Sequence, residues 1–135
     1  RQGSTKSAQW KGGGIIFAPK PRDFSQKINK SMKIAAFKSA ISAKLADSEI
    51  VVLDAVVLEQ PKTKLFQNIL DAFKVNGKNV MFVLKEKDDT ILRASNNIPN
   101  VKVTYADVLG TYDIVANSKL YITKDAIKKL EEAYK

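Results

Sequence analysis

A run of three glycines beside an aromatic and a basic side chain carries the most distinctive chemistry in this sequence. Lys11 precedes the glycines at 12–14, and Trp10 stands directly before it. Successive glycines let backbone N–H groups approach an anion closely, and a lysine adds positive charge. A nucleotide-hydrolysing P-loop needs a Lys-Ser or Lys-Thr pair after its last glycine and a strand before it, whereas Ile15 follows here. The run therefore favours contact with a phosphate backbone, with a flexible hinge as the alternative.

Trp10 is the only tryptophan, and it lies in a segment with few other apolar groups. One interpretation is that the indole covers the edge of the folded domain. The other is that it stacks on nucleobases, which its basic neighbours favour. Further along, the run PKPR at 19–22 is stiff and basic, because proline fixes φ, and stiffness lowers the entropy lost on binding.

Acid–base and metal chemistry have few candidate residues. The chain contains no Cys and no His, which excludes thiol nucleophiles, imidazole bases and the usual zinc sites. Two acidic pairs, at 88–89 and 131–132, have the pattern of solvated charge. Asp54 falls after the apolar run of the first predicted strand, near the sheet edge where α/β enzymes keep their active sites, but no base or nucleophile accompanies it. We therefore expect a protein that is not an enzyme and uses no cofactor, metal or small-molecule substrate.

The positive charge is concentrated at one end of the chain. Residues 1–44 contain ten basic residues and one acid, Asp23, whereas residues 45–135 contain thirteen of each. The net charge of +9 therefore lies entirely in the first third. A basic segment beside a neutral domain is typical of proteins that bind a polyanion.

The elements that must position these residues fall into two predicted regions. Residues 1–28 are rich in Gly, Ser and Pro and should form an extended basic arm, ordered by its partner. Residues 29–135 should form an α/β domain, beginning with a helix over 32–45 capped by Asn29 or Ser31. That helix should dock through a stripe of apolar residues, namely Ile34, Phe37, Ile41 and Leu45.

Strands and helices then alternate along the domain. We predict strands at 50–57, 80–84, 101–105 and 120–123, the first of them buried, and helices at 61–75, 90–96 and from a Thr123 cap to 134, with Gly77 as the C-cap after the second helix. Helical crossovers between strands imply a three-layer α/β/α fold with a mostly parallel sheet of about four strands. The apolar runs are too short to span a bilayer, so no membrane association is expected.

Several segments together resemble one known family over the whole chain. They are RQGSTKS at 1–7, QWKGGG at 9–14, PKPRD at 19–23, KSAIS at 38–42, PKTK at 61–64, RASNNIPNV at 93–101 and LYITKDA at 120–126. Their spacing is similar to that of the bacterial-type large-subunit ribosomal protein four family. In that family further residues precede the position of Arg1, so we expect this chain to be truncated at its N-terminus and residues 1–28 to be the returning limb of a loop.

The resemblance implies a structural constituent of the large ribosomal subunit in the cytoplasm. Its partners would be large-subunit rRNA, bound early in assembly, and neighbouring ribosomal proteins. The residues implied to contact rRNA are Arg1, Gln2, Ser4, Lys6, Ser7, Trp10, Lys11, Gly12, Gly13, Gly14, Lys20 and Arg22. The charge distribution adds four lysines, Lys27, Lys30, Lys33 and Lys38.

Two other functions are compatible with parts of the pattern. An α/β nucleotide-binding or enzymatic domain with an incidental basic tail remains an alternative. A DNA-binding arm is disfavoured, because no predicted helix has polar, base-reading side chains on an exposed basic face.

Overall fold

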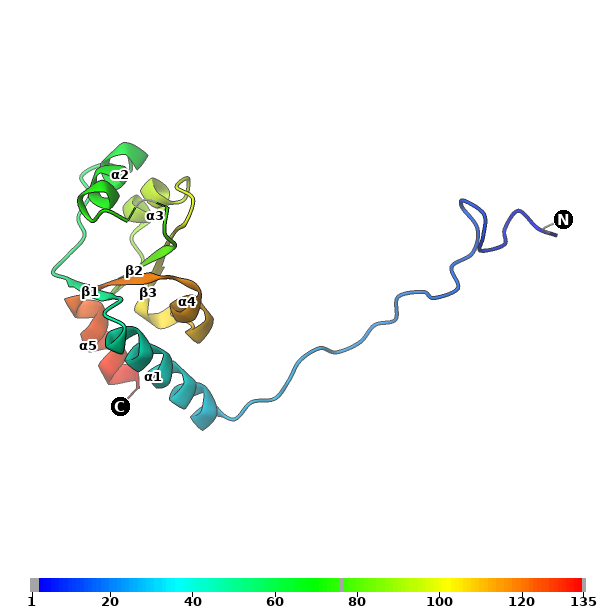
Figure 1. The fold of residues 1–135 in the computed structure, drawn as a ribbon, viewed down its shortest axis with the longest axis horizontal. Helices are drawn as coiled ribbons and strands as arrows, with labels where there is room; N and C mark the ends of the chain where they lie inside the picture. Colours follow the sequence, from blue (N-terminus) through cyan, green and yellow to red (C-terminus); the bar gives the residue numbers. More distant parts are fainter. Residues whose placement is uncertain (1–2, 76, 135) are drawn as a thin grey trace.

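The computed structural model describes residues 3–75 and 77–134. Residues 3–29 contain no helix or strand and run away from the domain as a long trace (Figure 1). The first helix, α1 (Lys30–Ala46), begins one residue after the predicted cap Asn29. The cap is made by the backbone, since the Asn29 side chain forms no capping hydrogen bond.

The domain has four parallel strands and the helices that connect them. In chain order the elements are α1, β1 (Ile50–Leu53), α2 (Thr63–Ala72), β2 (Val80–Leu84), α3 (Asp89–Ser95), β3 (Val101–Tyr105), the 3-10 helix η1 (Ala106–Val108), α4 (Thr111–Ala116), β4 (Lys119–Thr123) and α5 (Lys124–Ala133). The strand order is β1-β4-β2-β3, and all three pairings are parallel. The predicted α/β fold with a parallel four-stranded sheet is confirmed.

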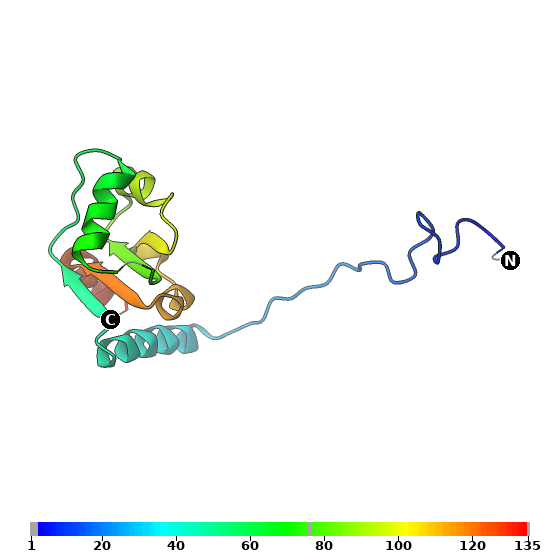
Figure 2. The same ribbon diagram turned by 45° about the horizontal axis from the view of Figure 1, so that its top comes forward.

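Alternating side chains of the central strands supply two separate cores. Met81, Val83 and Leu120 point to the side covered by α1, α4 and α5. Val80 and Phe82 point to the side covered by α2 and α3 (Figure 2). Because successive strand residues face opposite sides, a strand buried on both faces is apolar at every position, as β2 is. The domain is therefore the predicted three-layer structure.

Aromatic rings fill the core beneath α2. Phe82 stacks on Tyr121 with 4.9 Å between ring centroids and meets Phe66 edge-on at 5.3 Å. All three rings are buried. Burial also raises the pKa of the Tyr121 phenol, because the charged form loses its hydration. The packing of these rings makes β2 and β4 the rigid centre of the domain.

Two predictions about β1 are wrong. The strand covers Ile50–Leu53 instead of 50–57, and it lies at the edge of the sheet, half-buried with Val52 exposed. The apolar run continues to Val57, but that side chain is 79% exposed. An edge strand pairs with a neighbour on one side only and is less buried than a central strand. The length of its apolar run therefore does not determine where its pairing ends.

The second helix ends earlier than predicted, and Gly77 is not its cap. Lys74 takes the left-handed position, with φ of +52°, and the Val75 N–H donates to the Leu70 carbonyl at 3.3 Å. This is a Schellman ending, in which Val75 and Leu70 are both buried. Their apolar contact offsets the roughly 1–2 kcal/mol that a non-glycine residue loses in this conformation.

Other differences from the predicted elements are local. Leu45, expected to dock on the domain, is 66% exposed. Thr123 precedes α5 as predicted, but its hydroxyl donates to the Val83 carbonyl at 3.4 Å and does not cap the helix. The short elements η1 and α4 were not predicted. Ile114 of α4 is fully buried, yet a six-residue helix is too short to show helical periodicity.

Candidate RNA interface

The candidate interface begins with the exposed basic side chains of residues 3–46. Those predicted to bind RNA are exposed at every described position: Lys6, Lys11, Lys20, Arg22, Lys27, Lys30, Lys33 and Lys38. Arg1 and Gln2 lie outside the described residues. In Figure 1 the trace that carries the first five of these side chains extends away from the domain. The charge is thus spread along a segment that presents it to solvent on all sides.

A chain of tight turns shapes the segment at 4–14. The Ser7 N–H donates to the Ser4 carbonyl at 3.2 Å, the Trp10 N–H to the Ser7 carbonyl at 3.0 Å, and the Gly13 N–H to the Trp10 carbonyl at 2.9 Å. A fourth bond closes the loop, from the Gly14 N–H to the Lys6 carbonyl at 2.8 Å. This part of the arm therefore has local structure of its own.

Two of the three glycines are required by that structure. Gly12 has φ of +82° at the third position of its turn, where type II geometry favours glycine. A Cβ atom on Gly13 would overlap the carbonyl oxygen of Ser7. A Cβ atom on Gly14 would meet only the Lys6 carbonyl oxygen, at an ordinary 3.6 Å. Gly12 and Gly13 therefore have a conformational role that the sequence did not indicate.

Trp10 lies on the outside of this loop. Its side chain is 48% exposed, and the ring contacts of the described residues do not include it. The expectation that Trp10 covers the domain edge is not supported, because the first buried residue of the described chain is Phe37. The indole is therefore accessible to a ligand.

The middle of the arm contains two local contacts that sequence reasoning missed. The Arg22 guanidinium lies 4.2 Å from the centroid of the Phe24 ring, a cation–π contact. Asp23 accepts hydrogen bonds from the Ser25 N–H and hydroxyl, both at 2.8 Å. Both hydrogen bonds lower the pKa of the Asp23 carboxyl, and the bond from the Ser25 backbone N–H has the larger effect. The available signal for the cation–π contact was the occurrence of basic and aromatic residues at adjacent or alternate positions in the sequence.

The α1 helix attaches the arm to the domain. Phe37 is buried and stacks on Tyr134 with 4.3 Å between centroids, while Ile41 packs partly buried against the same core. The helix ends in a second Schellman motif, in which the Glu49 N–H donates to the Lys44 carbonyl at 2.9 Å. The side chains of Lys44 and Glu49 also form an ion pair. Lys44 is therefore paired within the protein, unlike the exposed lysines earlier in the helix.

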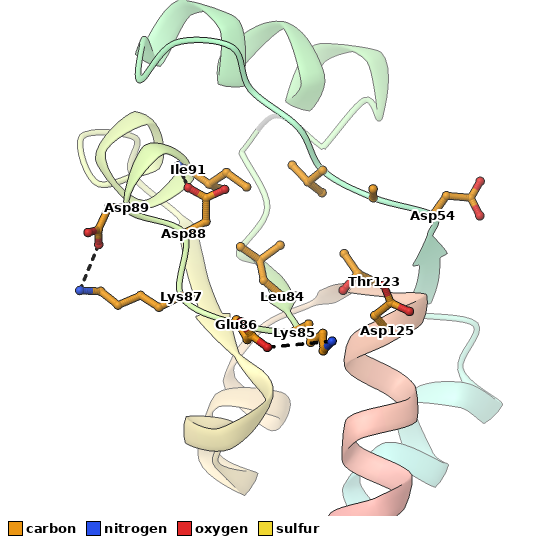
Figure 3. A pocket seen from close by; sticks show the side chains of 12 residues that line it. Asp54, Leu84, Lys85, Glu86, Lys87, Asp88, Asp89, Ile91, Thr123 and Asp125 are labelled. Carbon is orange, nitrogen blue, oxygen red and sulfur yellow. Dashed lines mark hydrogen bonds and ion pairs between the residues drawn. The ribbon is translucent and has the colours of Figure 1, made fainter.

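The carboxyl edge of the sheet holds a cavity of about 410 Å³ with several acids around it (Figure 3). Asp54 forms an ion pair with Lys124, which lowers the pKa of the Asp54 carboxyl mainly through its hydrogen bond. Asp88 caps α3 by accepting from the Thr90 N–H at 2.8 Å, and Asp89 pairs with Lys87 at 3.0 Å. Each of these acids has a local partner.

That arrangement offers no catalytic centre. In Figure 3 Asp54 points outward at one side of the cavity, away from Asp88 and Asp89 at the other. Within the described part of the chain, no group of three or more acids, His or Cys is placed to hold a metal ion. Nor is any described helix both long and apolar enough to cross a bilayer. The most distinctive feature of the molecule is therefore the basic arm with α1.

Comparison with known proteins identifies the family. Residues 1–133 match the sequence profile of the Ribosomal protein L4/L1 family. The large ribosomal subunit protein uL4 of Lachnoclostridium phytofermentans is 44% identical over 134 residues, and those of Lachnospira eligens and Thermoanaerobacter sp. strain X514 are 46% and 47% identical. Each alignment covers 99% of this chain and 64% of the relative, so the chain spans about two thirds of their length. The chain belongs to the Ribosomal protein L4/L1 family.

Proposed function

We propose that this chain is part of a structural, non-catalytic protein of the large ribosomal subunit in the cytoplasm and that it binds the subunit's rRNA early in assembly. The contacts are made by the arm and by the lysines of α1. The neutral α/β domain anchors the arm and faces neighbouring ribosomal proteins. The observation that carries the proposal is that residues 1–44 hold the entire net charge of +9 and that their described basic side chains, apart from Lys44, are exposed.

Counterion release explains why this charge distribution suits RNA. Each phosphate that a basic side chain neutralises frees condensed cations, so affinity falls steeply as salt rises. The arm and α1 carry nine basic residues besides Lys44, including Arg1 beyond the described residues. If six of them contact phosphates, affinity should fall by about 10³-fold between 50 and 200 mM salt. Binding would then depend on backbone contacts and on the shape of the folded RNA.

The relatives support the same function. They are proteins of the large ribosomal subunit, and the chain aligns with them over nearly its whole length. The alternative, a nucleotide-binding domain with an incidental tail, lacks a comparable observation. The acids of the cavity at the carboxyl edge are engaged by Lys124, Lys87 and the α3 cap, and no glycine-rich turn follows β1.

Deletion of residues 1–28 tests the proposal. Every buried residue of the described chain lies at Phe37 or beyond, so the remaining domain should unfold in urea at the concentration seen for the whole chain. Its affinity for a large-subunit rRNA transcript, measured by filter binding, should fall by at least about 100-fold, because six phosphate-binding groups are lost. Unchanged affinity of a folded deletion variant would refute the arm as the binding element.

A further inference from the structure

We propose that residues 4–14 form a preorganised stacking element, which holds Trp10 for an unpaired nucleobase while Lys6 and Lys11 neutralise the adjoining phosphates. This inference rests on the proposed function. It adds the class of ligand, a nucleobase outside a duplex, and it assigns Gly12 and Gly13 as positioning residues that act through the turn.

Closure of the loop is the first argument. The hydrogen bond from the Gly14 N–H to the Lys6 carbonyl joins the two ends of the nine-residue segment 6–14, and two consecutive turns, at 7–10 and 10–13, lie between them. Ser7 and Gly13 are the only half-buried residues at positions 3–29, so the inside of the loop is made of backbone. The indole is not needed to fill that inside. It is held on the outer surface by the turns on either side of it.

The character of the outer surface is the second argument. Trp10 has half of its surface free, Lys11 adjoins it in the chain, and Lys6 lies at the point of closure. All acids of the described chain come later, and the first is Asp23. An indole flanked by positive charge matches a base flanked by phosphodiesters, because the base offers a π-face and its neighbours offer negative charge.

Preorganisation explains why the glycines matter for this contact. An indole on a disordered chain loses conformational freedom when it stacks, and that loss weakens binding. The turn has already restricted the backbone at Trp10. A side chain at position 13 would displace the Ser7 carbonyl and open the loop, whereas one at position 14 would not. Gly110→Ala in the domain is the control for Gly13→Ala, because it is the same substitution outside the arm and its Cβ atom would meet only an Asp113 carboxyl oxygen, at an ordinary 3.5 Å.

The test uses the 135-residue chain and three RNA probes: a large-subunit rRNA transcript, a twelve-nucleotide single-stranded oligoadenylate, and a twelve-base-pair RNA duplex. Trp10 is the only tryptophan, so its fluorescence reports stacking directly. The single strand should quench the emission of the unsubstituted chain and of Gly110→Ala, and the duplex should quench it much less. In Gly13→Ala the quenching should be lost.

Affinities for the rRNA transcript and the single strand complete the test. Gly13→Ala and Trp10→Leu should each weaken binding by about 5- to 100-fold, the range expected for one stacked base, and the double variant should bind no worse than Trp10→Leu. The inference is overturned if Gly13→Ala binds and quenches like Gly110→Ala, or if Trp10→Leu binds normally. Salt-dependent rRNA binding without quenching would overturn it and leave the proposed function intact. Absence of rRNA binding altogether would refute both.

Discussion

The arm and the domain use their charged side chains in opposite ways. In the domain, Asp54, Asp89 and Asp113 form ion pairs with Lys124, Lys87 and Lys102, and residues 45–135 hold equal numbers of acids and bases. In the arm the one acid bonds to a serine, and the basic side chains at the described positions 3–29 are exposed and form no ion pair. The domain balances its charge internally, whereas the arm leaves it for a partner.

The same contrast holds for apolar groups. Phe82 and Phe66 are completely buried, whereas Phe17 is 94% exposed and Ile15, Ile16 and Phe24 are nearly as open. Hydrophobic burial therefore stabilises the domain and contributes almost nothing to the arm. A region without a core can be ordered only locally, by turns such as those at 4–14, or by the molecule that it binds.

The largest effect on stability should separate the two regions. Phe82→Ala removes a ring packed against Tyr121 and Phe66 and should lower the free energy of unfolding by about 3–5 kcal/mol. Phe17→Ala should change it by less than about 0.5 kcal/mol. Urea unfolding followed by circular dichroism measures both. A destabilised Phe17→Ala would show that the arm packs on the domain.

The next effect concerns the helix that joins the regions. Phe37→Ala breaks the stack on Tyr134 and should cost about 2–4 kcal/mol, because the ring is 4% exposed. Leu45→Ala, on the same predicted stripe, should cost less than about 0.5 kcal/mol. The same unfolding experiment applies. Equal losses would mean that Leu45 is covered in solution and that α1 docks along its whole length.

The smallest expected effect is a change in the pKa of two carboxyl groups, Asp54 in the domain and Asp23 in the arm. The pKa of Asp54 in the folded protein is below its ordinary value. The contact with Lys124 therefore stabilises the fold at pH values above the ordinary pKa, and this stabilisation is lost as the pH falls through the folded pKa. Lys124→Met should raise the pKa of Asp54 to its ordinary range, because the hydrogen bond and the charge of Lys124 are the causes that lower it. Ser25→Ala should raise the pKa of Asp23 only part of the way, because the backbone N–H, the larger cause, remains.

Carboxyl carbon chemical shifts recorded against pH measure both values. A complete return of Asp23 to its ordinary pKa in Ser25→Ala would show that the hydroxyl alone holds it. An unchanged Asp54 in Lys124→Met would show that the ion pair does not form in solution.

Much of the domain could be predicted from sequence because its signals are strong. β2, β3 and β4 were located within one residue. β2 and β4 are central strands and are apolar at consecutive positions, whereas β3 is an edge strand whose apolar residues alternate with polar ones. The end of β1 and the cap of α2 could not be predicted. Both depend on tertiary contacts: pairing of an edge strand in one case, and contact between Val75 and Leu70 in the other.

The candidate site shows a similar division. The position of the charge follows from counting residues. The exposure of the arm follows from its lack of apolar periodicity. The closure of 4–14 does not, because it depends on a hydrogen bond between Lys6 and Gly14 and on the space beside Gly13. The pairing of Lys44 with Glu49 was missed for the same reason, since it is formed by the way the helix ends.

The salt dependence of rRNA binding tests the central claim most directly. One variant replaces five arm residues with Gln, namely Lys6, Lys11, Lys20, Arg22 and Lys27. A matched variant replaces five exposed domain residues with Gln, namely Lys62, Lys64, Lys74, Lys78 and Lys85. Both variants lose five positive charges, one from the arm and the other from the domain.

Filter binding to a large-subunit rRNA transcript between 50 and 300 mM salt gives the slope of log affinity against log salt for each protein. The arm variant should lose about 3 to 5 units of slope, and the domain variant should retain nearly the slope of the unsubstituted chain. Equal losses in the two variants would contradict the account, because binding would then depend on net charge and not on the arm.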